Sequence, residues 1–155
     1  MAGPDDLVQP FRIDPFALRG RLVRLGPTID RILSQHAYPE PVAAMLGEAI
    51  TLAVVLAGAL KYDGIFTLQT KGDGPIRLIV ADVSTSGALR GYAQYDEAKL
   101  ETALSGARMT AMLSVPRLLG SGYIAFTVDQ GEDTDRSIYL ARVAGQLDDG
   151  LGPPP

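Results

Sequence analysis

Residues 41–60, PVAAMLGEAITLAVVLAGAL, are almost all apolar and predict one long helix at the centre of the fold. Pro41 suits the first turn of a helix, where its missing N–H costs nothing. Small residues such as Ala44 and Gly47 lie on the other faces and indicate close packing on more than one side. The apolar residues recur in steps of three and four, the period of a helical face: Val42, Met45, Leu46, Ala49, Ile50, Ala53, Leu56, Ala57 and Leu60.

A membrane-spanning helix is the alternative for this stretch, because about 20 apolar residues are enough to cross a bilayer. Glu48 and Thr51 interrupt the apolar run, and alanine and glycine dominate it. We therefore expect a buried core helix and no membrane contact. Residues 1–10 show no basic region before an apolar run, so no signal peptide is predicted and a cytoplasmic location follows as the default.

The residues before this helix predict a strand and a shorter helix. The segment Asp14–Leu25 has the pattern of a short lead followed by a strand that ends in Leu22, Val23 and Leu25. Thr28 is a candidate N-cap for the helix that follows. Its apolar face comprises Ile29, Ile32, Leu33 and His36, and the pair Tyr38-Pro39 is expected to end it.

The residues after the central helix predict short strands separated by four- or five-residue turns, which is typical of an antiparallel meander. Strands are predicted at 65–70, 76–82, 88–95 and 123–128, with turns at 71–75 and 84–87 and weaker helical character over 98–112. Residues 130–135 form an acidic turn, and 137–143 is the candidate hairpin partner of 123–128. The predicted fold class is α+β, in which antiparallel β-meander sheets pack on the central apolar helix in a single domain.

Composition excludes several classes of function. The 155 residues suit one domain with a substantial core. The chain contains no cysteine and one histidine, which excludes disulfides, thiolate metal sites and thiol catalysis within it. Its net charge of −4 and scattered basic residues argue against nucleic acid as a partner. The densest basic group is Arg12, Arg19, Arg21 and Arg24.

Two motifs invite a catalytic or nucleotide-binding interpretation and fail its requirements. Gly72-Asp73-Gly74-Pro75 is glycine-rich, but a phosphate-binding loop requires a helix after the glycines and here a strand is predicted. We interpret it as a turn. Ser84, Thr85 and Ser86 also lie in a predicted turn and lack the G-x-S-x-G pattern of a nucleophile.

The remaining ionisable candidates have simpler structural interpretations. His36 is expected at the C-terminal end of a helix, where a cation is favoured, and no partner for general-base chemistry is evident. The acidic cluster Glu132, Asp133 and Asp135 lacks the spacing of a calcium loop and suits a solvated hairpin tip. No catalytic, cofactor-binding or metal-ligating residue is therefore predicted, and the chain is not expected to be an enzyme.

Several stretches together resemble the N-terminal domain of the heat shock protein thirty-three family of bacterial chaperones. The order and spacing of these stretches are specific, although each is short, and the resemblance covers about residues 11–135. The matching stretches are Val23–Pro41, the apolar helix through Leu60, Leu60–Gly64, Gln69–Pro75, Leu89–Ala93 and Leu119–Tyr123.

The resemblance implies an ATP-independent holdase that binds unfolding proteins under oxidative and heat stress. It also implies a C-terminal module whose four cysteines bind zinc when reduced and release it on oxidation. This cysteine-free chain departs from that pattern, so no zinc site is carried over, and the linker and the zinc-binding domain are expected to be absent. The predicted organisation is an N-terminal chaperone core over 1–149 and a Gly/Pro tail over 150–155.

Client binding has two alternatives, a structural domain and a small-molecule enzyme. A mean hydropathy of +0.12 suggests exposed apolar surface that could hold unfolded or misfolded client proteins. The same surface and exposed strand edges could serve a structural domain that forms a homodimer without binding clients. A small-molecule enzyme would require a pocket with converging polar groups, which the sequence does not indicate.

Overall fold

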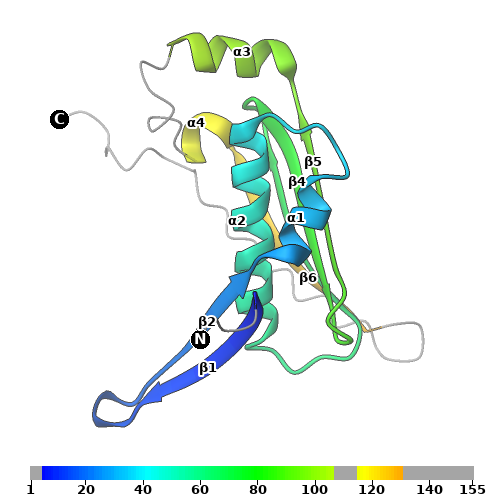
Figure 1. Ribbon diagram of the computed structural model, residues 1–155. Coiled ribbons are helices and arrows are strands. Elements are labelled where there is room, and N and C mark those ends of the chain that lie inside the picture. Colours follow the sequence, from blue (N-terminus) through cyan, green and yellow to red (C-terminus); the bar gives the residue numbers. More distant parts are fainter. Residues whose placement is uncertain (1–4, 107–114, 131–155) are drawn as a thin grey trace, which may run out of the picture.

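The computed structural model describes residues 5–106 and 115–130, which form an α+β domain with one helix packed across a sheet and a β-ribbon projecting from it (Figure 1). This confirms the predicted fold class. The elements, in chain order, are β1 (Asp6–Ile13), a 3-10 turn (Asp14–Phe16), β2 (Leu18–Leu25), α1 (Pro27–Leu33), α2 (Glu40–Ala57), β3 (Ile65–Gly72), β4 (Ile76–Ser84), β5 (Leu89–Tyr95), α3 (Glu97–Gly106), α4 (Val115–Leu119) and β6 (Gly122–Asp129).

Helix α2 supplies one half of the hydrophobic core, as its three-four pattern predicts. Val42, Leu46, Ile50 and Ala53 are fully buried, and the helix packs chiefly against β4 and β5. By length and composition this helix could span a membrane, a test that the core helix of a soluble protein also passes. The prediction of a buried core helix is confirmed. The sheet residues of the core are Phe66, Leu68, Ile76, Ile79, Ala81, Val83, Ala93 and Val128, and the other helices add Ile32, Leu100, Leu118 and Leu119.

The helix approaches the sheet closely at one glycine of β5. A Cβ atom at Gly91 would lie 2.5 Å from Ile50 Cδ1 and 3.2 Å from Ile32 Cγ2. Glycine therefore allows both α1 and α2 to pack against the same strand, and a side chain here would push them apart.

The larger sheet has the strand order β5-β4-β3-β6, and every neighbouring pair is antiparallel. Strands β3, β4 and β5 form the predicted meander. Strand β6, for which the sequence offered no partner within this meander, returns to pair with β3, so that the four strands have the order of a Greek key. The predicted partner segment 137–143, the acidic residues 132–135 and the tail 150–155 lie outside the described residues.

Only one face of this sheet is covered by helices in the described part of the chain. Phe66, Leu68 and Thr70 of β3 point to α2, and the alternate residues point to the opposite face. On that open face Thr67 donates a hydrogen bond to Asp82 Oδ1 (2.7 Å), and Arg90 forms an ion pair with Asp82 Oδ2 (2.6 Å). These polar contacts suit a surface that faces solvent.

The N-terminal helix is shorter than predicted. Helix α1 ends at Leu33, and the Ser34 hydroxyl donates to the carbonyls of Asp30 (2.6 Å) and Arg31 (3.2 Å). His36 therefore lies in the turn after the helix and does not belong to its last turn. Thr28 is inside the helix, and the N-cap is Gly26, so the proposed N-cap was also wrong.

The N-terminal ribbon is the largest departure from the sequence prediction, which placed a polar lead and a single strand in this region. Strand β1 pairs with β2 over their whole length, from Asp6 opposite Leu25 to Ile13 opposite Leu18. Pro10 is tolerated because a two-stranded ribbon has open edges, where a missing N–H need not break a ladder. The ribbon extends away from the body, at the end of the sheet opposite α3 and α4 (Figure 1).

Candidate functional site

The two faces of the β1–β2 ribbon differ in chemistry. Residues that are paired across an antiparallel ladder point to the same face, and the next pair points to the other. One face carries Leu7, Gln9, Phe11, Ile13, Leu18, Leu22 and Arg24, and the other carries Val8, Pro10, Arg12, Arg19, Arg21 and Val23. The register therefore separates an apolar face from a face that is basic toward its tip.

The apolar row is the feature of the ribbon with the greatest capacity to bind another molecule. We define it as Phe11, Ile13, Leu18 and Leu22, whose exposed fractions are 48%, 42%, 55% and 58%. Phe16, in the turn at the tip, is 73% exposed. Contiguous apolar surface of this kind marks an interaction site more often than scattered exposed residues do.

One glycine shapes this row. The ring of Phe11 lies directly over Gly20, its cross-strand partner, in the space that a Cβ atom would occupy. The ring thus lies across the ribbon, between the side-chain positions of Leu18 and Leu22, and links them into one apolar row.

The opposite face of the ribbon joins it to the body. Val23 and Leu25 pack against the core, and Arg21 lies over the C-terminal end of α2, where a Cβ at Gly58 would be 3.2 Å from Arg21 Nε. A cation is favoured at that end of a helix. The attachment leaves the apolar row facing away from the body.

A carboxylate fixes the root of the ribbon to α1. Asp6 Oδ1 accepts the N–H of Gly26 (2.9 Å), and Asp6 Oδ2 accepts the hydroxyl hydrogen of Thr28 (2.5 Å). The hydrogen bonds from Thr28 and Gly26 lower the pKa of Asp6 below its ordinary value of 3.8. The first strand is therefore tied to the domain although it begins the described chain.

A groove of about 440 Å³ lies at the same root. The side chains of Leu25, Val54, Ala57 and Leu60 contribute its apolar wall, and Tyr62 lies beside them. The Tyr62 hydroxyl donates to the carbonyl of Val83 (3.0 Å), and burial raises the pKa of this phenol. The groove continues the apolar character of the ribbon onto the body.

A second groove, of about 600 Å³, lies along the outer edge of β5 and contains His36. The His36 ring is 5.3 Å from the Tyr38 ring and 5.9 Å from the Tyr92 ring, measured between centroids. The Tyr38 hydroxyl accepts the N–H of Ala93 (3.2 Å). His36 is thus a member of an aromatic cluster with Tyr38 and Tyr92.

The glycine-rich segment 72–75 is a turn between β3 and β4, as predicted. Its backbone donors are already used: the N–H of Asp73 bonds to Ser121 O and the N–H of Gly74 bonds to Leu119 O, both at 3.1 Å. A Cβ at Gly74 would lie 2.7 Å from Leu118 O, so the chain at 118–121 fills the space that a phosphate would need. The turn is therefore closed by protein backbone.

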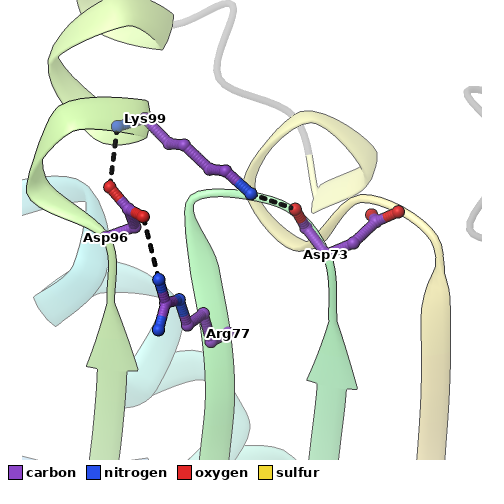
Figure 2. Close-up of polar contacts among 4 residues, drawn as sticks. All are labelled: Asp73, Arg77, Asp96 and Lys99. Carbon is purple, nitrogen blue, oxygen red and sulfur yellow. Dashed lines mark hydrogen bonds and ion pairs between the residues drawn. The ribbon is translucent and has the colours of Figure 1, made fainter.

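Side chains reinforce this end of the sheet, as Figure 2 shows. Asp96 accepts the backbone N–H of Lys99 at the start of α3 (3.0 Å) and forms an ion pair with Arg77 (2.9 Å). Lys99 Nζ donates to the carbonyl oxygen of Asp73 (3.1 Å), while Asp73 Oδ1 accepts the N–H of Ser121 (2.7 Å). These four contacts hold β4, α3 and the start of β6 together.

The hydroxyls of the serine-threonine turn also have structural partners. Ser84 Oγ accepts the N–H of Ala88 (2.9 Å), and Thr85 Oγ1 accepts the N–H of Gly64 (2.7 Å). Ser86 Oγ lies 2.8 Å from Ser84 Oγ. This arrangement closes the β4–β5 turn and contains no base that would activate a nucleophile.

The sequence prediction did not identify the ribbon as a site. A signal was present in Phe11, Ile13, Leu18 and Leu22, which are apolar and lie at even spacings on either side of the turn-forming pair Asp14-Pro15. The intervening arginines and Pro10 obscured it. Among the described residues, the structure groups no three histidine, cysteine, aspartate or glutamate side chains in a way that could hold a metal ion.

The sequence of this chain is similar to those of known proteins. The chain is 42% identical over 142 residues to the 33 kDa chaperonin of Caulobacter vibrioides (strain NA1000 / CB15N), a match that covers 92% of this chain and 46% of the relative. It is 39% identical over 127 residues to the 33 kDa chaperonin of Pseudomonas syringae pv. tomato, covering 81% and 39%. The chain thus spans less than half the length of these relatives.

The fold also matches a solved structure. The 33 kDa chaperonin of Thermotoga maritima, described as a heat shock protein 33 homolog, superposes with a TM-score of 0.69 over 90% of this chain and 46% of that chain, at 20% identity. The sequence model of the family described as Hsp33 protein matches residues 6–148. The chain therefore belongs to the Hsp33 family.

Proposed function

We propose that this chain is the client-holding core of a chaperone, and that it keeps unfolding proteins from aggregating without ATP. Membership of the Hsp33 family and the name chaperonin given to its relatives support this proposal. Unfolding proteins are the expected partners, because they expose the apolar segments that native proteins bury.

The observation that carries the proposal is the exposed apolar row of the ribbon. Phe11, Ile13, Leu18 and Leu22 form one face of an element that projects from the body (Figure 1). Burial of each of these side chains would contribute about 1 kcal/mol or more to the free energy of binding. A client segment that covers the row would supply that burial.

A light-scattering assay tests this directly. A client enzyme is heated until it aggregates, with and without the chain, and with the double variant Leu18→Thr/Leu22→Thr. Threonine keeps the β preference of these positions and removes the apolar surface. We expect the parent chain to suppress scattering and the double variant to lose most of that suppression.

The matched control is Ile65→Thr, a β3 residue that is 38% exposed and points to the open face of the larger sheet. This variant should suppress scattering as the parent does. Equal suppression by the parent and the ribbon variant would move client binding away from the apolar row, and no suppression by the parent would refute the proposed function.

The redox control and the zinc expected for the family are proposed to reside in residues that this chain does not contain. The chain has no cysteine and one histidine, so thiolate coordination and disulfide formation are chemically unavailable to it. We expect the same suppression of aggregation in reductant and in peroxide, and no zinc retained after dialysis. Activation by peroxide would contradict this assignment.

We also propose a non-enzymatic, cytoplasmic role without nucleic acid as a partner. The closed 72–75 turn supports independence from nucleotides, since its N–H groups are bonded to Ser121 and Leu119. Addition of ATP and Mg²⁺ is expected to leave the scattering curves unchanged. A nucleotide-dependent release of client would contradict the ATP-independent mechanism.

A homodimer is the second candidate, and the open strand edges favour it. Within the described residues β5 and β6 end the larger sheet, and both edges of the ribbon are open to a third strand. Sedimentation at several concentrations separates the two functions. A tight dimer that neither binds a hydrophobic dye nor suppresses aggregation would identify a structural, dimerising domain.

A further inference from the structure

The edge of β2 offers two different rows of side chains to a strand added beside it. Leu18 and Leu22 point to the apolar face of the ribbon, while Arg19 and Arg21 point to the opposite face. A third strand would place its alternate residues beside these two rows, because successive side chains in a strand point to opposite faces.

The edge of β2 suits an added strand better than the edge of β1. Pro10, in the middle of β1, cannot donate a hydrogen bond to a neighbouring strand, whereas β2 contains no proline from Leu18 to Leu25. The strand-adding mode supplies affinity through main-chain hydrogen bonds and selectivity through alternate side chains. Binding at the edge of β2 can therefore depend on the order of side chains in the added strand as well as on its total hydrophobicity.

One positive charge on this edge, that of Arg19, is not neutralised by neighbours in the described residues. Arg12 pairs with Asp14 (2.7 Å), Arg24 lies 3.9 Å from Asp5 and Arg21 lies over the C-terminal end of α2, whereas Arg19 has no ion pair within that part of the chain. Residues 6–25 hold four arginines and two aspartates in a chain whose net charge is −4. The ribbon is thus a positive element on a negative molecule, and acidic segments are attracted to it.

We propose that this ribbon binds client segments as a third strand on the edge of β2 and prefers extended segments in which apolar and acidic residues alternate. The apolar residues would cover Leu18 and Leu22, and an acidic residue would lie beside Arg19 on the opposite face. This inference rests on the proposed holding function and adds the class of segment that is held.

Fluorescent peptides of about eight residues, the length of an ordinary strand, test the preference. One alternates valine and glutamate, one alternates valine and serine, and one has the valine–glutamate composition in two blocks. Anisotropy with the full chain should show tightest binding for the alternating valine–glutamate peptide. Added salt should lower the affinity of this peptide more than it lowers the affinity of the valine–serine peptide. A fourth peptide, with two consecutive prolines at its centre, should not bind, because one of them must occupy a position whose N–H would pair with β2.

Arg19→Gln is the variant that isolates the charge, since it leaves the apolar row unchanged. This variant should bind the valine–glutamate peptide with an affinity about two- to five-fold lower, the range expected for an exposed charge pair. Its affinity for the valine–serine peptide should be unchanged. Arg117→Gln, on the exposed surface of α4, is the matched control and should change neither affinity.

Equal affinity for the valine–glutamate and valine–serine peptides, or for the alternating and block peptides, overturns this inference while aggregation suppression still upholds the holding function. Binding of the proline peptide would overturn strand addition in the same way. If a second copy occupies the edge, the chain will sediment as a dimer and bind none of the peptides, which also overturns the inference. Loss of both peptide binding and aggregation suppression refutes both proposals.

Discussion

Asp96 joins three parts of the fold with one carboxylate. The backbone N–H of Lys99 and the side chain of Arg77 both donate to it, and these hydrogen bonds lower its pKa below the ordinary value of 3.8. Its folded-state pKa is therefore below the unfolded one. The stability that it contributes is fully present above about pH 4 and is lost as the pH falls through the lower folded value.

The variant Asp96→Asn separates the two roles of this side chain. Asparagine still caps α3 but removes the charge that pairs with Arg77, whereas Asp96→Ala removes both. We expect the melting temperature near neutral pH to fall in the order parent, Asn, Ala, and the acid-induced decline to be shallower in both variants. Thermal denaturation between about pH 7 and about pH 3 measures this. An unchanged acid decline would show that other carboxylates dominate it.

Two threonines of β3 should affect the stability of the fold in opposite directions when each is replaced by valine. Thr70 is buried and its hydroxyl has no hydrogen-bond partner in the described structure, whereas the Thr67 hydroxyl donates to Asp82 on the open face. Thr70→Val should stabilise the fold by about 1 kcal/mol, and Thr67→Val should destabilise it by a similar amount. Urea denaturation compares them, and a destabilised Thr70→Val variant would indicate that the hydroxyl is satisfied.

At the scale of elements, α2 is the main support of the core. Ile50 is fully buried against Gly91, whereas Leu52 is 45% exposed on the same helix. Ile50→Ala should cost about 2–5 kcal/mol because it leaves a cavity, and Leu52→Ala should cost much less. Equilibrium unfolding of the pair gives the comparison, and similar losses would mean that α2 does not bury the face described above.

The sequence predicted α2 and strands β3 to β5 because their patterns are local. A helical period over 20 residues and short apolar runs between glycine-rich turns need no knowledge of distant contacts. The pairing of β6 with β3 could not be predicted in this way, since it joins residues such as Phe66 and Val128 across the segment that contains α3 and α4.

The ribbon was missed for a related reason. Pro10 and Arg12 weaken the strand signal of β1, and the root is fixed by the contact of Asp6 with Thr28, which are 22 residues apart. His36 was placed in a helix because its spacing continues the apolar face. The Ser34 hydroxyl instead caps the helix two residues earlier. Local periodicity cannot report such tertiary contacts.

In the molecule as a whole, the body contains the hydrophobic core and the ribbon carries the exposed apolar row. The body buries an apolar core between α2 and the sheet, while the ribbon exposes Phe11, Leu18 and Leu22 on an element that projects from it (Figure 1). Changes to the ribbon's outer half should therefore alter client binding with little effect on stability. This separation makes the holding function testable without unfolding the protein.

Site-directed photocrosslinking tests the central claim most directly. A photoreactive residue is placed at Leu22 on the apolar row and, in a second sample, at Tyr123, which is 40% exposed on β6. Each chain is irradiated with a client enzyme during heating. We expect strong crosslinking to the unfolding client from position 22 and little from position 123. Crosslinking from position 123 with none from position 22 would contradict it.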